Sequence, residues 1–364
     1  MVQVNPALAA FLARRCAATV TLAPGVATPA RFSGAAAEHL ATRRAAGLFD
    51  FSFMYCVEIE GAGSRDFLRV LQTRAVDRLA HGRIAYTLLL RDDGSVLIDA
   101  TVWRLDDHRY WLFTGRRADA AYVAATARGY AVTLQDRSAL QAVIAVQGPA
   151  STALIERVFS GQNPRALPYF GFMQLEFAGA ECWLARIGYS GEHGYELIVA
   201  DAVAPALWEA LRTKDSGVLE CGFEAADSLR IEAGHILFTR ELAAAATPAE
   251  LGLMRLIDFQ RPEFRGAAAL IAQRWRVPAR RLVGMLPLNR ARLDTGGPGA
   301  ARRDQAVLTS RAWSPLLERE LAMGLVPRGD AVPGALVTLA NGERARVARL
   351  PFYDPARILP RQQA

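Results

Sequence analysis

The stretch Val57-Glu58-Ile59-Glu60-Gly61, followed by Phe67 and Leu68, has a counterpart elsewhere in this chain of 364 residues. The counterpart is Ile144-Ala145-Val146-Gln147-Gly148, followed by Ala153 and Leu154, so the two glycines lie 87 positions apart. An alternating apolar and polar run that ends at glycine predicts a half-buried strand and a turn, and the apolar spacing after it predicts a helix.

A second pair of segments repeats at nearly the same distance. Tyr110-Trp111-Leu112-Phe113 leads into an alanine-rich helical stretch, and Tyr195-Glu196-Leu197-Ile198 leads into another at 204–211, 85 positions later. Two consistent offsets predict two related α+β units of about 85 residues, each with strand–helix–strands–helix order. Chance similarity between two strand–turn–helix segments is the alternative that the sequence leaves open.

The segments around these repeats fill in the remaining elements. Residues 86–90 and 96–103 are strand-like and flank Asp92-Asp93-Gly94, which predicts a β-hairpin. Residues 1–46 are rich in alanine and contain Pro24 and Pro29, which predicts helix and loop.

The last third of the chain has a different pattern. Residues 246–276 indicate a helical connecting segment, and from Pro278 onward short apolar runs at 281–286, 321–326, 335–339 and 345–350 predict a small all-β, barrel-like domain. The sequence therefore predicts an α+β protein with a first α+β domain at 1–50 and 140–245, a second at 51–139, a connecting segment at 246–276 and a β domain at 277–364.

Composition and cysteine usage narrow the class of protein. With 52% hydrophobic and 22% charged residues the chain is globular, which excludes a disordered or fibrous protein. No apolar run approaches the roughly 18 residues of a membrane helix, and no basic residue precedes the first apolar stretch as in a secretory signal. The four cysteines lie far apart without a C-x-x-C spacing, so we expect reduced, structural thiols and a cytoplasmic location.

The formal net charge is +7, but the basic residues are dispersed among acidic ones. Lys214 is the only lysine, which is typical of an arginine-biased coding background, so we expect no nucleic-acid partner. The densest basic stretch is 274–281, with Arg274, Arg276, Arg280 and Arg281 around Trp275. It is either a solvated segment between domains, the interpretation that we favour, or a nucleic-acid patch. The excess of positive charge would favour anionic ligands.

Common catalytic motifs are missing. The chain has no phosphate-binding P-loop, Gly61-Ala62-Gly63 does not continue to a third glycine at dinucleotide-binding spacing, and Gly188-Tyr189-Ser190-Gly191 lacks the register of a nucleophile elbow. The five histidines share no metal-ligand spacing, so we expect no metal site.

Two acidic residues stand in apolar strands. Asp99 lies within Val96–Val102, where alternation places it on one face with Leu97 and Thr101, which we expect to face inward. Glu196 opens the strand 197–199, seven residues after Tyr189 in a glycine-rich loop. A buried carboxylate costs several kcal/mol unless it is paired, so each is either a partner of an arginine or part of a functional site.

Further motifs occur in a fixed order along the chain, and together they resemble the folate-dependent aminomethyltransferase family, to which the glycine cleavage T-protein belongs. The matching segments are Gly47-Leu-Phe-Asp50-Phe-Ser-Phe-Met54, Tyr86-Thr-Leu-Leu-Leu90, Gly94-Ser-Val-Leu-Ile-Asp99, Val146-Gln-Gly-Pro149, Arg186-Ile-Gly-Tyr189-Ser-Gly-Glu-His-Gly-Tyr-Glu196, Asp227-Ser-Leu-Arg-Ile-Glu-Ala-Gly234, Thr247-Pro-Ala-Glu250, Ser314-Pro-Leu316 and Pro351-Phe-Tyr353.

This resemblance implies a fold and a set of roles. It implies a ring of two related α+β domains and a β-barrel domain around a central tetrahydrofolate channel. It implies that Asp99 is the catalytic residue beside the reactive edge of the folate, where a carboxylate stabilises charge that develops on nitrogen. It further implies that Glu196 accepts parallel N–H bonds from the pterin, and that Tyr86, Tyr189 and Met54 contact the cofactor.

The chain departs from the family pattern at several positions near the cofactor or the donor entrance. Ala226 replaces an arginine, Gly115 an asparagine, Arg255 a tryptophan and Phe53 a histidine, and the stretch 238–242 also differs. Arg255 would restore the lost positive charge if its guanidinium reached the channel.

The sequence thus predicts an enzyme that moves an aminomethyl or methyl group from a small-molecule or carrier-bound donor, a lipoyl carrier among them, onto tetrahydrofolate. Two alternatives remain: a non-catalytic folate-binding module, and a repurposed scaffold that no longer binds folate.

Overall fold

The repeat predicted from the sequence is present as two sheets of matching topology. The computed structural model describes residues 6–23, 26–212, 217–288 and 304–362. One sheet has the strand order β5-β6-β7-β4-β8, and the other has the order β10-β11-β12-β9-β3-β13. The second order is that of the first with one extra strand, β3 (Ala46–Asp50), inserted between β9 and β13.

Each unit runs strand, helix, three antiparallel strands, helix and strand. The first sheet belongs to β4 (Tyr55–Glu60), α3 (Ser64–Leu71), β5 (Arg83–Leu90), β6 (Val96–Arg104), β7 (Arg109–Thr114), α4 (Ala120–Thr126) and β8 (Thr133–Asp136). The second belongs to β9 (Gln141–Gln147), α5 (Ser151–Val158), β10 (Phe172–Phe177), β11 (Ala180–Ala185), β12 (Gly194–Ala200), α6 (Ala204–Leu211) and β13 (Val218–Cys221).

The N-terminal segment differs from the prediction of helix and loop. Two helices, α1 (Pro6–Ala13) and α2 (Ala35–Arg44), flank an antiparallel pair, β1 (Ala18–Ala23) and β2 (Val26–Arg31). The run Thr19-Val20-Thr21 explains the difference, because β-branched residues favour strands and outweigh the surrounding alanines. Pro29 is tolerated because the sheet has only two strands, so both are edges.

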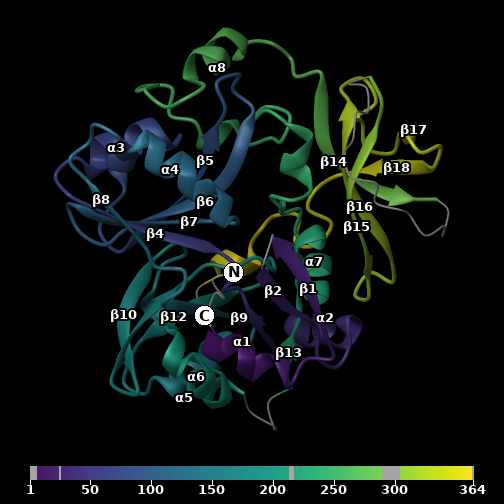
Figure 1. The fold of residues 1–364 in the computed structure, drawn as a ribbon. Helices are drawn as coiled ribbons and strands as arrows, with labels where there is room; N and C mark the ends of the chain where they lie inside the picture. The colour runs from purple at the N-terminus through teal and green to yellow at the C-terminus, as the bar shows by residue number, and fades with distance from the viewer. Residues whose placement is uncertain (1–5, 24–25, 213–216, 289–303, 363–364) are drawn as a thin grey trace.

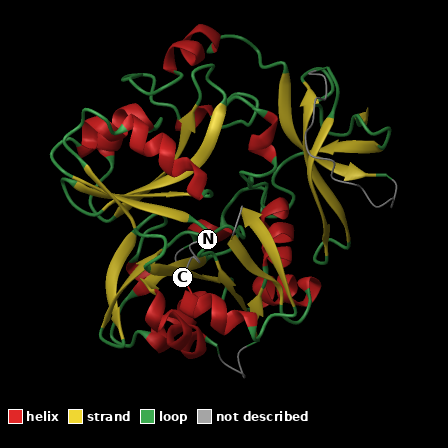
Figure 2. Cartoon of the chain, in the orientation of Figure 1, coloured by secondary structure: helices red, strands yellow, loops and turns green. Residues whose placement is uncertain are grey.

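The two main sheets stack face to face, with helices on their outer sides (Figures 1 and 2). Helices α1, α5 and α6 pack on the six-stranded sheet, whereas α3 and α4 pack on the five-stranded sheet. Between the inner faces lies a largely aromatic core, which we call the inter-sheet cluster. It includes Phe49, Trp103, Trp111, Phe113, Phe172 and Ile198.

Helix α7 (Phe223–Glu232) lies between helix α2 and the C-terminal sheet. Its Glu232 binds the Arg43 guanidinium of α2 at 2.7 Å and also accepts a hydrogen bond from Ser314. Its Arg230 donates to Ser310 Oγ at 2.6 Å and pairs with Glu241 at 3.0 Å. Because Ser310 and Ser314 belong to the C-terminal sheet, these buried contacts hold that sheet against α7.

The C-terminal part is all-β, as predicted. Its strands are β14 (Arg280–Pro287), β15 (Val307–Ser314), β16 (Arg319–Pro327), β17 (Leu336–Thr338) and β18 (Arg344–Ala348), in the order β15-β16-β14-β18-β17. β15 and β17 are the two edge strands of this sheet, and they approach each other. The amide of Ala340, just after β17, donates to the carbonyl of Ala306, just before β15, at 3.0 Å. The sequence analysis missed β15, because its buried Thr309 and Ser310 are polar and bind Glu241.

The connecting segment contains a 3₁₀ turn, η6 (Met254–Leu256), and one helix, α8 (Ala267–Gln273). Pro248, Gly252, Pro262 and Gly266 interrupt the rest. We propose that the three large sheets are the centres of three domains with the limits given above. In the described ranges, no helix has the length and hydropathy needed to cross a bilayer.

Candidate functional site

Asp99 lies on the inner face of the five-stranded sheet. In β6 the residues Val96, Ile98 and Ala100 are buried, whereas Leu97, Asp99 and Thr101 are only partly covered. These last three residues share one face, as expected, and that face is partly covered, whereas the opposite face is fully buried. The opposite face meets the helices α3 and α4, so the face of Asp99 is the one that looks toward the other sheet.

A tyrosine, and no arginine, is the side-chain partner of Asp99. Tyr86, on the adjacent strand β5, donates its hydroxyl to Asp99 Oδ2 at 2.9 Å. No ion pair to Asp99 is found within the described residues, so the interpretation of a structural pair with arginine is wrong for this position. Burial raises the pKa of Asp99 to about 6, although the hydrogen bond from Tyr86 acts in the opposite direction.

Tyr189 lies close to this pair and packs against a second ring. Burial raises the pKa of both Tyr86 and Tyr189 well above 10, and each tyrosine lies within electrostatic range of Asp99. The Tyr189 hydroxyl donates to the carbonyl of Ile236 at 2.7 Å, and its ring stacks on His235 with centroids 5.9 Å apart. Both tyrosines therefore stay protonated at neutral pH.

His235 is a part of the site that the sequence analysis did not single out. Burial, together with the positive charges of Arg357, Arg230 and Arg43, lowers its pKa to about 3. The imidazole is therefore neutral and presents a flat, uncharged ring beside Tyr189.

Glu196 is the second buried carboxyl group, on the inner face of the six-stranded sheet. Its side chain shares that face with Ile198 of the inter-sheet cluster. Its direct neighbours across β12 are Ala145 on β9 and Ala185 on β11, and neither can offer it a polar group. Glu196 is only 7% exposed, and its carboxyl group makes no hydrogen bond or ion pair with any residue in the described part of the chain. Burial raises its pKa to about 7.

The structure brings three of the five predicted site residues into one group. Asp99, Tyr86 and Tyr189 interact directly or electrostatically, and Met54 lies partly buried at the edge of the inter-sheet cluster, which Tyr189 also borders. Among the described residues no hydrogen bond or ion pair joins the Glu196 carboxyl group to this group, so the carboxyl groups of Asp99 and Glu196 have separate surroundings.

Polar side chains of α7 and the following turn also lie within electrostatic range of Tyr189. Arg230 is fully buried between Asp227, at 2.7 Å, and Glu241, at 3.0 Å. Asp227 and Arg230 are three residues apart on a helix, a spacing that brings side chains together. That spacing is a signal in the sequence, whereas no local pattern indicates that Glu241 joins them.

The substitution at Gly115 has a structural explanation. A Cβ atom at this position would lie 2.2 Å from Cδ1 of Phe238, so the ring of Phe238 occupies the space that a side chain at position 115 would need. Ala226 and Phe53 both border the apolar inter-sheet cluster. Positions 53 and 226, where the family pattern has polar residues, are therefore apolar in this chain. Nothing in the structure explains why alanine replaces arginine at position 226.

Arg255 lies on the surface, in a hollow that Arg74 and Arg78 also line. Its positive charge nevertheless acts on the hydroxyl of Tyr86 and favours the ionised form. The guanidinium therefore lies near the Asp99 group without being buried in it.

Other sequence-based expectations can be checked against the described residues. Arg280 forms a buried ion pair with Glu250 at 3.0 Å, so it does not contribute to a basic surface patch around Trp275. In this part of the chain, no cluster of three or more His, Cys, Asp or Glu side chains is placed to hold a metal ion. The four cysteines are free.

Comparison with known proteins agrees with this geometry. The family described as the GCVT N-terminal domain matches residues 10–261. The chain belongs to the GCVT family. Among GCVT relatives, the aminomethyltransferase of Saccharopolyspora erythraea is 36% identical over 354 residues, covering 92% of this chain and 94% of that protein. The aminomethyltransferase of Prochlorococcus marinus is 33% identical over 344 residues, covering 89% and 91%.

A solved GCVT structure has the same fold. The glycine cleavage system aminomethyltransferase T from Bartonella henselae superimposes with a TM-score of 0.84 and is 27% identical in sequence. The match covers 95% of this chain and 97% of that one. The family resemblance and the fold class predicted from the sequence are thereby confirmed.

Proposed function

We propose that this protein is a tetrahydrofolate-dependent aminomethyltransferase. Its membership of the GCVT family and its similarity to aminomethyltransferases along nearly the whole chain support an enzyme of this class. The observation that carries the proposal is the presence of two carboxyl groups that have no cationic partner in the described residues, the partly covered Asp99 and the buried Glu196, on the facing sides of two sheets. An unpaired buried acid is costly, and a ligand that binds it offsets this cost.

Glu196 is the proposed anchor of the pterin. The amino-pyrimidine edge of a pterin carries parallel N–H donors, which match the two oxygens of one carboxylate. Ala145 and Ala185, the neighbours of Glu196 on the two adjacent strands, carry no polar side-chain group, and no side chain in the described residues donates to the oxygens of Glu196. The residues present therefore fit the cofactor.

Asp99 is the proposed catalytic residue. Bound tetrahydrofolate supplies the nitrogen nucleophile that accepts the one-carbon unit. A fixed carboxylate in a partly desolvated site stabilises positive charge on that nitrogen, and it can hold the proton that the nitrogen loses. A pKa of about 6 keeps most of Asp99 ionised at neutral pH and close to the range in which a group can both accept and release a proton.

Tyr86 orients Asp99 through its hydrogen bond, while Tyr189, stacked on His235, and Met54 form proposed walls of the cofactor site. Because His235 is neutral, the wall that it forms with Tyr189 carries no positive charge that would compete with the reacting nitrogen for Asp99.

The proposed donor carries an aminomethyl or methyl group, either as a small molecule or attached to a carrier protein such as a lipoyl carrier. The apolar character of Phe53 and Ala226 is the feature of this chain that should distinguish its donor from that of relatives with polar residues there. Turnover of both kinds of donor with tetrahydrofolate would identify it.

Calorimetric titration with 5-formyltetrahydrofolate tests the cofactor assignment. We expect binding by the wild type, and a Glu196→Gln variant should bind about tenfold to 150-fold more weakly, the effect of losing a charged hydrogen bond. Glu176→Gln is the matched control, because Glu176 is exposed on β10 of the same sheet. Absence of binding by the folded wild-type protein would contradict the proposal and favour a scaffold that has lost its folate site.

A further inference from the structure

A segment without regular structure holds Tyr189 in place. The hydroxyl of Tyr189 donates to the carbonyl of Ile236 at 2.7 Å, and its ring stacks on His235. Residues 235–237 follow helix α7 and precede the 3₁₀ turn η5 (Glu241–Ala244), outside any helix or strand. Such a segment has no ladder of backbone hydrogen bonds, so its buried polar groups need partners among side chains.

Two buried charged side chains provide these partners at the two ends of the segment. Arg230 donates to the carbonyl of His235 at 3.1 Å, and Glu241 accepts the amide of Leu237 at 2.8 Å. Arg230 and Glu241 also pair with each other at 3.0 Å, and neither side chain is exposed. The carbonyl of Ile236 lies between these two attachment points, so its position depends on both.

The C-terminal sheet completes the surroundings of Glu241. Thr309 and Ser310, neighbours on β15, each donate a hydroxyl hydrogen bond to Glu241 Oε1 at 2.6 Å. Glu241 Oε2 accepts the amide of Leu237 and the guanidinium of Arg230. Each carboxylate oxygen thus receives two hydrogen bonds, and a buried polar network whose members are all satisfied is rigid. A path of short contacts therefore runs from β15 through Glu241 to the segment after α7.

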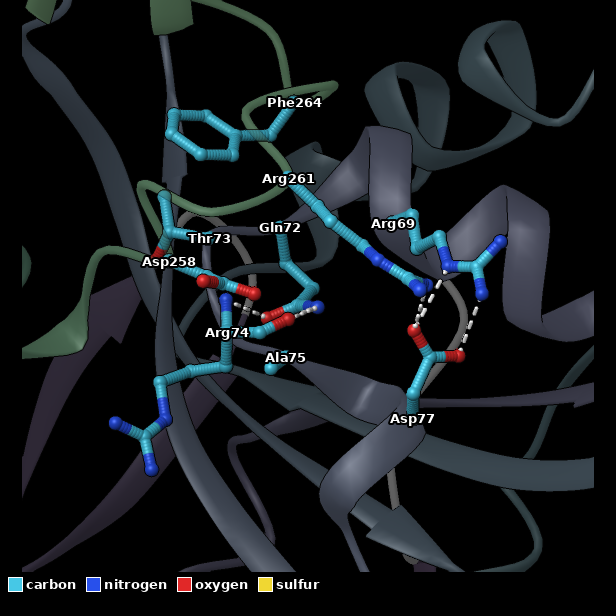
Figure 3. Close-up of a pocket in the computed structure, with 9 residues that line it drawn as sticks. All are labelled: Arg69, Gln72, Thr73, Arg74, Ala75, Asp77, Asp258, Arg261 and Phe264. Carbon is cyan, nitrogen blue, oxygen red and sulfur yellow. Dashed lines mark hydrogen bonds and ion pairs between the residues drawn. The ribbon is translucent and has the colours of Figure 1, made fainter.

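An exposed tie elsewhere in the molecule shows the contrast. Arg261 of the connecting segment pairs with Asp77 at 2.8 Å, and Arg69 of α3 shares that carboxylate at 2.7 Å (Figure 3). The Arg261 side chain is 57% exposed, and an exposed ion pair contributes little free energy. The contacts of Glu241, in contrast, cannot rearrange without leaving a buried charge undercompensated. The buried path can therefore fix positions at the site.

We propose that Glu241 is a positioning residue for folate binding: it holds the 235–237 segment, and through it Tyr189, in the place where the tyrosine contacts the ligand. This inference rests on the proposed function, because it takes Tyr189 to be a wall of the cofactor site. The C-terminal sheet then acts on ligand binding through Glu241, which Thr309 and Ser310 orient.

Calorimetric titration with 5-formyltetrahydrofolate tests the inference by comparing two buried glutamates. Glu232 and Glu241 both pair with an arginine and both accept a hydroxyl hydrogen bond from β15, but in the described part of the chain only Glu241 bonds to residues 235–237. At a temperature where circular dichroism shows each variant folded, Glu241→Gln should bind about fivefold to tenfold more weakly than the wild type, the effect of losing one hydrogen bond that orders the site. Glu232→Gln is the matched control and should stay within about twofold of the wild type.

A double-mutant cycle shows whether the effect passes through Tyr189. Tyr189→Phe removes the hydroxyl that donates to Ile236. In this background Glu241→Gln should therefore change the affinity by less than about twofold. A general structural loss would instead add in full to the effect of Tyr189→Phe.

A second pair of variants changes β15 and leaves both glutamates intact. Ser310→Ala removes a hydrogen-bond donor to Glu241, whereas Ser314→Ala removes a donor to Glu232 from the same strand. Ser310→Ala should weaken binding by about threefold, and Ser314→Ala should leave it unchanged. This pair decides the question if Glu241→Gln does not fold.

The outcomes separate this inference from the proposed function. If the wild type binds and Glu241→Gln loses no more affinity than Glu232→Gln, the inference is wrong and the proposed function stands. Equal losses from Glu241→Gln with and without the Tyr189 hydroxyl also overturn it. If Glu241→Gln does not fold, equal affinities of Ser310→Ala and Ser314→Ala overturn it. If the folded wild type does not bind, the proposed function fails and the inference fails with it.

Discussion

Replacing Glu196 with glutamine should stabilise the ligand-free protein, and the gain should depend on pH. The carboxyl group of Glu196 is buried, and in the described residues it has no partner, so burial raises its pKa from 4.5 to about 7. Below pH 4.5 both the folded and the unfolded chain hold the proton, and the residue has no electrostatic cost. Between pH 4.5 and 7 only the unfolded chain loses the proton, so the folded state becomes progressively less favourable.

The size of the effect follows from the two pKa values. A pKa that rises from 4.5 to about 7 corresponds to about 3 kcal/mol of folding free energy, fully present above pH 7. Glutamine has nearly the same shape and no charge in this range, so any cost of burying its amide does not vary with pH. The free energy of unfolding of Glu196→Gln minus that of the wild type should therefore increase by about 2.5 kcal/mol between pH 5 and pH 8.

Urea unfolding followed by circular dichroism at several pH values measures this difference. Glu176→Gln controls for the loss of one acidic residue, because Glu176 is exposed in the same sheet and should show almost no pH-dependent difference from the wild type. A difference between Glu196→Gln and the wild type that stays constant from pH 5 to 8 would refute the reasoning, since it would mean that Glu196 ionises normally in the folded protein.

Three other substitutions test separate parts of the structure. In steady-state kinetics, kcat/KM of the wild type should rise as the pH increases through about 6, because Asp99 ionises there. Asp99→Asn should lower kcat/KM by about a hundredfold or more and remove this pH dependence. If the variant keeps the pH profile of the wild type, Asp99 is not the group that titrates. Gly115→Ala should cost about 1–3 kcal/mol in urea unfolding, because the new methyl group meets the ring of Phe238; in a Phe238→Ala background the cost should largely disappear, and an equal cost in both would rule out this contact. Glu232→Gln should lower the free energy of unfolding by about 3 kcal/mol, because it leaves the buried Arg43 guanidinium undercompensated; thermal unfolding identical to that of the wild type would show that Glu192 alone suffices as its partner.

The repeat was predictable because it depends on local patterns. The segments that begin at Val57 and at Ile144 both show strand alternation, then a glycine turn, then one apolar helix face. Each of these patterns depends only on residues that are close in sequence. The strand β15 was not predictable in this way, since its buried Thr309 and Ser310 look like loop residues until Glu241 is placed against them. The hairpin of β1 and β2 was not predictable for a related reason, because its short β-branched run is surrounded by alanines.

The site was predictable only in part. Asp99 and Glu196 could be singled out because each is an acidic residue in an apolar strand. Periodicity does not show whether an arginine pairs with either residue, because such pairing depends on which side chains the two sheets bring opposite each other. The contact of Phe238 with Gly115 and the grouping of Arg74 with Arg255 join residues more than 100 positions apart. No local signal in the sequence records such contacts.

The place of β3 in the six-stranded sheet has a consequence for biosynthesis. β3 leaves the ribosome before the whole five-stranded unit, yet its partners β9 and β13 follow only after that unit is complete. The chain enters and leaves the inserted unit at adjacent points, since the amide of Phe51 donates to the carbonyl of Val143 at 2.9 Å. We therefore expect residues 55–136 to fold first during translation, while β3 waits as an unpaired edge. The rate at which the ribosome synthesises residues 137–221 then determines how long β3 remains unpaired and able to bind chaperones or neighbouring nascent chains.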